Sequence, residues 1–127
     1  MALTHTTATR NAMVNTVVDR IDLGTTDANG DLVYWTSGDA EVCVAAFANP
    51  AFGDGSGGVG TANAIGDATS AGGGTIAKCM VRDRDNTEHL RGSVTATGGG
   101  GDIEITSVVI AATEVVRTTS LTYTAPP

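Results

Sequence analysis

The glycines of residues 53–60 have a spacing that could bind a nucleotide. Gly53, Gly55 and Gly58 satisfy the G-x-G-x-x-G pattern, in which a close backbone approach and a following helix hold a pyrophosphate. The residues that follow, Val-Gly-Thr-Ala-Asn-Ala-Ile-Gly, do not predict that helix. We therefore expect a flexible loop, and we expect neither a nucleotide nor another cofactor.

The same loop nearly spells the Gly-Asp-Ser-Gly-Gly of serine proteases, with one glycine inserted before Ser56. A serine nucleophile needs a histidine base that a third group orients. The chain has two histidines: His5 lies in a segment expected to fray, and His89 follows Glu88 at the start of a short predicted strand. No catalytic residue is predicted from this pattern.

Acidic residues occur in two short clusters that could attract a hard cation. Residues 27–31, Asp-Ala-Asn-Gly-Asp, resemble the opening of a calcium loop, but the twelfth loop position is Gly38 instead of the required glutamate. A turn is the better interpretation, because Asn-Gly adopts positive φ readily. Asp83, Asp85 and Glu88 lack clustered ligand spacing, so we expect a solvated hairpin end and no metal site.

Cys43 and Cys79 are the two cysteines, too few for a disulfide scaffold and without metal-ligand spacing. Each lies in a predicted strand among apolar residues, which favours buried free thiols. A disulfide between them requires that the two strands be neighbours, with Cα atoms within about 7 Å. Both alternatives stay open at this stage.

One amphipathic helix must precede the strands. In residues 6–22 an apolar stripe recurs at helical spacing, with Thr4 or Thr6 as a candidate N-cap and Gly24 just beyond the end. The stripe consists of Met13, Val14, Val17, Val18 and Ile21. Such a helix either packs on its own sheet or docks as an arm on a partner, and Met13 and Val17 are candidate interface residues for the second case.

After residue 22 the sequence changes to β-branched runs separated by turn residues. Seven strands are predicted, at 31–37, 41–47, 59–65, 75–82, 88–95, 102–110 and 114–124. The short polar segment 83–87 predicts a hairpin between the fourth and the fifth. The predicted fold class is mainly β: an antiparallel β-sandwich or jelly-roll-like barrel with one N-terminal amphipathic helix. Residues 1–24 form the helix or arm, and residues 25–127 form a single β-sandwich domain.

Aromatic residues are scarce, and two of them are adjacent. Alternation along a strand sends Tyr34 and Trp35 to opposite faces of the sheet, so one of them must lie at the surface or in an interface. Buried aromatics dominate contact energy at interfaces. Tyr34, Trp35 and Phe52 are therefore further candidate interface residues, with a partly exposed core position as the alternative.

The composition excludes several classes of partner. Gly, Ala and Thr make up 55 of the 127 residues, and aromatic residues only 4%, so large side chains for a core are few. The net charge of −7 argues against nucleic acid, whose binding depends on basic residues. No apolar run approaches the roughly 20 residues that span a bilayer, and a soluble chain without a signal peptide is expected. A thin core predicts that neighbouring subunits supply part of the burial.

Several segments together resemble small virion proteins of tailed bacteriophages. They are Met1-Ala-Leu-Thr, Arg10-Asn-Ala-Met-Val-Asn-Thr-Val-Val, Asn49-Pro-Ala-Phe-Gly, Gly58-Val-Gly-Thr-Ala-Asn-Ala-Ile, Leu90-Arg-Gly-Ser-Val-Thr, Gly101-Asp-Ile-Glu-Ile and Ser120-Leu-Thr-Tyr-Thr. The resemblance implies a non-enzymatic structural protein of the virion, assembled in the host cytoplasm. Its implied role is a capsid decoration protein on the outer surface of the head.

The partners that this resemblance implies are the major capsid protein and other copies of the chain, with a trimer as the expected assembly. A neck or tail component (fibre, collar or head–tail adaptor) is the alternative within the virion. A carbohydrate-binding adhesion module, with Tyr34 or Trp35 near Asp31, is a less favoured class. An enzyme is the least favoured.

Overall fold

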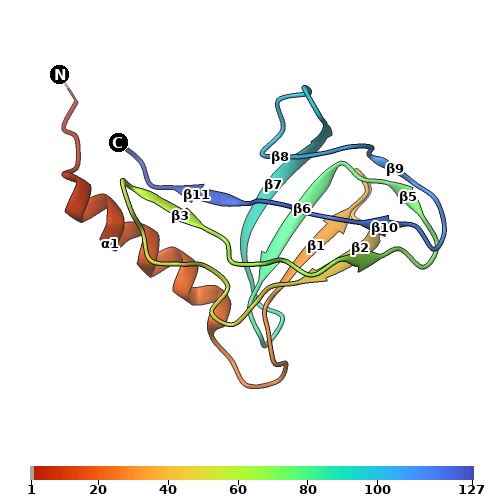
Figure 1. Cartoon of the computed structure of the whole chain (residues 1–127), viewed down its shortest axis with the longest axis horizontal. Coiled ribbons are helices and arrows are strands. Elements are labelled where there is room, and N and C mark those ends of the chain that lie inside the picture. The colour runs from red at the N-terminus through yellow and green to blue at the C-terminus, as the bar shows by residue number, and fades with distance from the viewer. Residues whose placement is uncertain (1) are drawn as a thin grey trace.

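A computed structural model describes residues 2–127 and places one helix before eleven short strands (Figure 1). Helix α1 (Thr7–Val18) begins at Thr6, whose side chain accepts a hydrogen bond from the Thr9 amide at 3.2 Å. A 3₁₀ turn, η1 (Asp19–Asp22), tightens its end. The predicted helix is confirmed, with Thr6 as its N-cap.

Five strands form one curled sheet with the order β2-β1-β6-β7-β8 (Figure 1). Their bounds are β1 (Asp31–Trp35), β2 (Glu41–Ala46), β6 (Lys78–Arg82), β7 (Glu88–Ala96) and β8 (Ile103–Ile105). The predicted hairpin between β6 and β7 is confirmed. The sheet is not antiparallel throughout as expected, because β7 and β8 pair in parallel. Gly98 and Gly100 adopt positive φ in the connecting loop, which lets the chain double back and re-enter in the same direction.

Residues 59–75 and 109–124 cross this sheet side by side as an interrupted antiparallel ribbon (Figure 1). Its three paired steps are β3 (Val59–Thr61) with β11 (Thr122–Thr124), β4 (Ala68–Thr69) with β10 (Val115–Val116), and β5 (Gly74–Thr75) with β9 (Val109–Ile110). The long strands predicted in these regions are therefore broken into shorter ones. One cause is visible at Gly66, whose amide leaves the ribbon to bond the Ala46 carbonyl of β2 at 2.9 Å.

One hydrophobic core joins the helix, the sheet and the ribbon. The helix contributes Val14, Val18 and Ile21, while Met13 and Val17 on the same stripe are only half-buried. The core side of the sheet and the ribbon between them contribute Leu32, Tyr34, Ala45, Val81, Ile76, Ile110 and Val116. The mainly β fold class with one N-terminal helix is confirmed, and the helix and the turn after it share one core with the strands.

The glycine-rich loop before β3 is ordered by the helix, contrary to the expectation of a flexible segment. Asn11 and Asn15 present their side-chain oxygens to the amides of Gly58 and Gly55, at 2.8 and 2.7 Å. A Cβ at Gly60 would lie 2.7 Å from the Val14 side chain, so only glycine allows this close approach. Contacts within the chain therefore offset the backbone entropy that is lost when these glycines are ordered.

Candidate functional site: an open groove and two exposed faces

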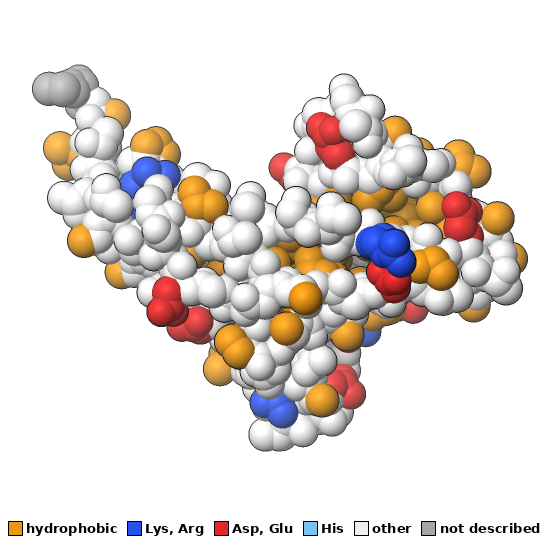
Figure 2. Space-filling view, viewed as in Figure 1, with side chains coloured by type: hydrophobic (Ala, Val, Ile, Leu, Met, Phe, Trp, Pro, Cys, Tyr) orange, Lys and Arg blue, Asp and Glu red, His pale blue; other side chains and the backbone are white. Residues whose placement is uncertain are grey.

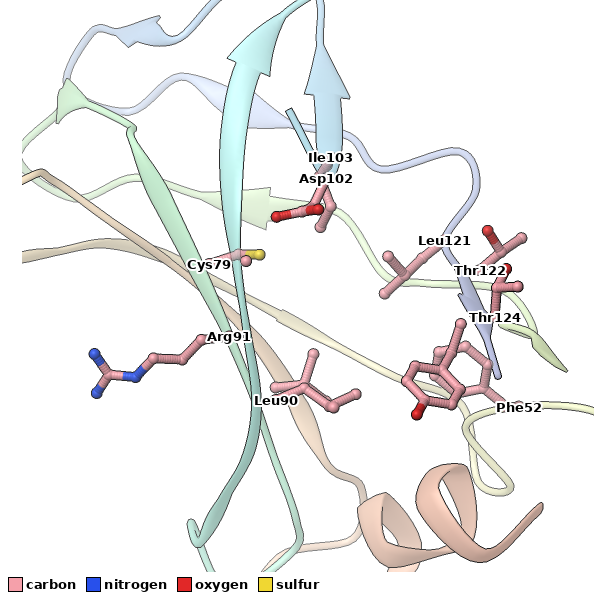
Figure 3. Close-up of a pocket in the computed structure, with 12 residues that line it drawn as sticks. Phe52, Cys79, Leu90, Arg91, Asp102, Ile103, Leu121, Thr122 and Thr124 are labelled. Carbon is pink, nitrogen blue, oxygen red and sulfur yellow. The ribbon is translucent and has the colours of Figure 1, made fainter. Parts of the chain in front are cut away.

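An apolar groove separates β7 of the curled sheet from β11 of the ribbon (Figure 3). Its volume is about 280 Å³. Leu90 from β7 and Leu121 from the segment before β11 point into it, and Phe52 lies at one end. Tyr123 also lines it. Asp102 lies at the opposite end, where its carboxylate accepts hydrogen bonds from the amide and hydroxyl of Ser93 at 2.8 and 3.0 Å. These bonds hold the pKa of Asp102 below its usual range.

The groove exists because two strands have one unpaired edge each. Strand β8 joins β7 only from Val94 onward, so among the described residues Glu88–Gly92 pair with β6 alone. Strand β11 pairs with β3 on one side, and no described strand pairs with its other side. The groove therefore combines an apolar floor with backbone donors and acceptors along both walls, an arrangement that suits an additional strand.

A second apolar surface lies on the outer side of helix α1. Met13 and Val17 form a shallow depression with Tyr123 of β11 and with Pro126, with a volume of about 420 Å³. Tyr123 lines both this depression and the groove. Figure 2 shows the outline of the molecule hollowed between the N-terminal segment and the loop that joins β7 to β8. Met13 and Val17, predicted as interface residues, are thus partly exposed and adjacent.

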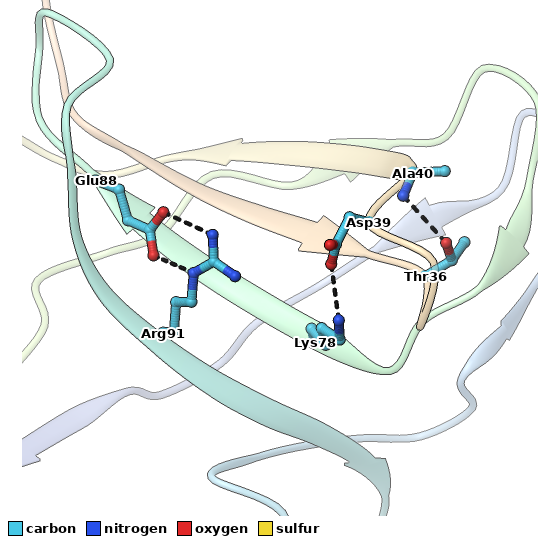
Figure 4. A network of polar contacts seen from close by, with 6 residues as sticks. All are labelled: Thr36, Asp39, Ala40, Lys78, Glu88 and Arg91. Atoms are coloured by element: carbon cyan, nitrogen blue, oxygen red, sulfur yellow. Dashed lines mark hydrogen bonds and ion pairs between the residues drawn. The ribbon is translucent and has the colours of Figure 1, made fainter.

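The outer face of the sheet carries two ion pairs, Glu88 with Arg91 and Asp39 with Lys78 (Figure 4). The Arg91 guanidinium lies 5.1 Å from the centre of the Trp35 ring and is paired with Glu88. Lys78 donates a hydrogen bond to Asp39 at 2.7 Å. These partners hold the pKa values of Glu88 and Asp39 below their usual ranges. Trp35, a predicted interface residue, is half-buried, and Arg91 covers its ring.

Tyr34 and Phe52, also predicted as interface residues, belong to the core. Tyr34 is fully buried, and its hydroxyl hydrogen-bonds that of Thr118. Burial raises the pKa of Tyr34 to about 12. Because alternation turns Tyr34 inward and Trp35 outward, Trp35 is the adjacent aromatic left at the surface. Phe52 is buried against Phe47, with ring centres 5.8 Å apart.

Cys43 and Cys79 are both buried and free, as the favoured prediction had it, and the alternative of a disulfide between them is wrong. They lie on β2 and β6 and face Tyr34 from opposite sides, because β1 separates the two strands. Two strand spacings put their Cα atoms about 9–10 Å apart, beyond the reach of a disulfide. Burial raises the pKa of each thiol to about 11.

The acidic hairpin end between β6 and β7 is solvated at Asp85 and Glu88, as expected, but Asp83 is a buried structural contact. Asp83 is buried, accepts hydrogen bonds from the amides of Asp85 and Thr87, and pairs with His89 at 2.8 Å. Burial opposes ionisation of Asp83, but these hydrogen bonds outweigh it and lower its pKa. Asp85 also reaches the loop after η1, where its carboxylate accepts the amides of Thr25 and Thr26, both at 2.9 Å, which lowers its pKa.

Across residues 2–127, no three His, Cys, Asp or Glu side chains lie where they could hold one metal ion. The glycine loop donates the Gly55 and Gly58 amides to helix asparagines, which removes two amides that a phosphate would use. The one helix described is too short and too polar to cross a membrane.

Comparisons with protein-family models, with curated proteins and with solved structures found no match for this chain. The groove and the helix face are therefore the features on which a function is proposed.

Proposed function

We propose that this chain is a non-enzymatic structural protein of a bacteriophage virion, a decoration protein that binds the outer surface of the head. The observation that carries the proposal is that the apolar stripe of helix α1 is buried on one side and partly exposed on the other. Val14, Val18 and Ile21 are buried in the core, whereas Met13 and Val17 stay partly exposed beside Tyr123. An apolar depression on a rigid helix is suited to docking against another protein.

Two further properties support the proposal. The sequence resemblance to small phage virion proteins extends over most of the chain, and the net charge of −7 would keep an abundant subunit soluble before assembly. Met13 and Val17 are only partly buried, so covering them on a capsid would add apolar burial that the chain lacks alone. The proposed partners are the major capsid protein and other copies of the chain.

The carbohydrate-binding alternative has little support from the sheet face. Arg91 covers the ring of Trp35, and Asp31 pairs with Arg82 at 3.0 Å. A sugar site would need this aromatic face and this carboxylate to be free.

The test is the copy number of the chain in purified particles. A decoration protein is expected in a number that matches the capsid lattice, whereas a number that matches one vertex or the tail would indicate the neck or tail alternative. Absence from the particles would overturn the virion proposal altogether.

A paired variant tests the docking face itself. Val17→Asp, in the depression, should lower occupancy on particles that lack the chain at least tenfold relative to the natural chain. Thr7→Asp is the matched control, because Thr7 is exposed on the same helix and belongs neither to the depression nor to the core. Equal occupancy for the two variants would contradict docking through this face.

A further inference from the structure

We propose that the groove between β7 and β11 binds residues 2–6 of a second copy of this chain as an added strand. The proposal concerns self-association and goes beyond binding to a capsid.

The acceptor is built for a strand and lacks one. Its walls are the edges of β7 at Glu88–Gly92 and of β11 at Thr122–Thr124, which pair within the described chain only on their opposite sides. Its floor is apolar, with Leu90 and Leu121 pointing into the space between the walls (Figure 3). A strand placed there would bond to an edge through its backbone and bury a side chain in the floor.

The donor is the segment before helix α1. Residues 2–6 have neither helical nor strand structure, and Leu3 is 99% exposed, more than any other large hydrophobic residue of the described chain. The segment leads away from the body of the molecule (Figure 1). His5 lies against the carbonyl oxygen of Pro127 at 2.9 Å, which fixes the base of the segment at that end. Its direction therefore presents Leu3 to a neighbour and not to the groove of its own chain.

The dimensions of donor and acceptor agree. Five extended residues span about 17 Å, and the free edge of β7 at Glu88–Gly92 is also five residues long. Side chains alternate along a strand, so Leu3 would face the floor, with His5 on the same side at the base of the segment beside Pro127, while Ala2, Thr4 and Thr6 face outward. The small outward residues let the segment lie flat between the walls.

The occupant is a second copy because every copy carries both parts. A stable interface buries about 1,200 Å² or more, and a five-residue strand alone is small for that. If each copy donates one segment and accepts another, the contacts are repeated and close into a symmetric assembly.

The experiment is light scattering on the full chain, expressed without an N-terminal tag, over a series of concentrations. The natural chain should form an oligomer, and Leu3→Asp should be a monomer with unchanged thermal unfolding. Val109→Asp is the matched control, because Val109 is 66% exposed on β9, outside the groove, and this variant should remain oligomeric. A monomeric natural chain, or a Leu3→Asp variant that associates like the natural chain, would overturn the proposal.

Mixing then identifies the groove as the acceptor. Leu90→Asp, whose own fold is checked by thermal unfolding, should lose the acceptor and keep the donor. If it does not fold, Leu121→Asp takes its place. Mixed with Leu3→Asp, which keeps the acceptor, it should form a one-to-one dimer that neither variant forms alone. This dimer should need a higher concentration than the natural oligomer, because it makes only one donor–acceptor contact. No dimer in the mixture would contradict the proposed groove. These outcomes do not depend on the copy number in particles, so the two proposals can fail separately.

Discussion

Tyr34 carries a hydroxyl into the centre of the core, and Thr118 of the ribbon is its partner. We expect Tyr34→Phe to lower the free energy of unfolding by about 1–2 kcal/mol, because it leaves the buried Thr118 hydroxyl without a partner. Chemical denaturation measures this loss. In a double-mutant cycle with Thr118→Val, the double variant should lose less than the sum of the single variants. Additive losses would show that the two hydroxyls do not interact.

The two thiols should be inert in the folded protein. Both are buried, and their raised pKa of about 11 leaves almost no thiolate at about pH 8, where an ordinary free cysteine is partly ionised. Iodoacetamide should therefore add no label to the native chain and two labels after unfolding, as mass spectrometry can measure. Rapid labelling of native Cys79, which lines the groove, would show that the groove opens further than the structure indicates.

At the scale of elements, the helix and the glycine loop stabilise each other through Asn11 and Asn15. Asn15→Ala should cost about 1 kcal/mol of unfolding free energy and speed hydrogen exchange at the Gly55 amide, which loses its acceptor. Thr16→Ala is the matched control, because that exposed side chain bonds only within the helix, and its cost should be within about 0.5 kcal/mol. Equal exchange at Gly55 in both variants would contradict this role.

The elements predicted well are those that local sequence determines. The stripe of α1 and the turn between β6 and β7 each involve residues close in the chain, so periodicity and turn chemistry were sufficient. The pairing of β1 with β6 joins residues more than forty apart, and no local pattern encodes that choice. The disulfide hypothesis failed for the same reason, since the order β2-β1-β6 decides whether Cys43 and Cys79 are neighbours.

The candidate site was only partly predictable. Met13 and Val17 were predicted as interface residues because the helical period places them on the same apolar stripe as the residues that the core buries. Leu90 and Leu121 were missed because their importance depends on the groove between β7 and β11, which forms only when the chain is folded. Asn11 and Asn15 were missed because a polar residue on a helix ordinarily faces water.

At the scale of the whole molecule, acid should destabilise the fold. Asp83, Asp85 and Asp102 each accept hydrogen bonds that hold their pKa below the ordinary 3.8, so the unfolded chain binds protons more readily than the folded one. Their contribution is complete above pH 3.8 and is lost as the pH falls through the lower folded values. Asp22, whose pKa is raised by burial, opposes them with a contribution that is lost as the pH rises.

The melting temperature should therefore be nearly constant from neutral pH to about pH 5, then fall steeply below about pH 4. Asp85→Asn isolates one contributor, because it removes the charge that receives the Thr25 and Thr26 amides while keeping the size of the side chain. This variant should melt at a lower temperature than the natural chain at pH 7, and the difference should shrink as the pH falls below 3.8, because Asp85 then becomes protonated first in the unfolded chain and at lower pH in the folded one. Asp54→Asn, in the glycine-rich loop, is the control and should leave the difference between pH 7 and pH 3 unchanged. If Asp85→Asn instead differed from the natural chain by the same amount at both pH values, the ionised carboxylate would not be what joins the hairpin end to the loop after the helix.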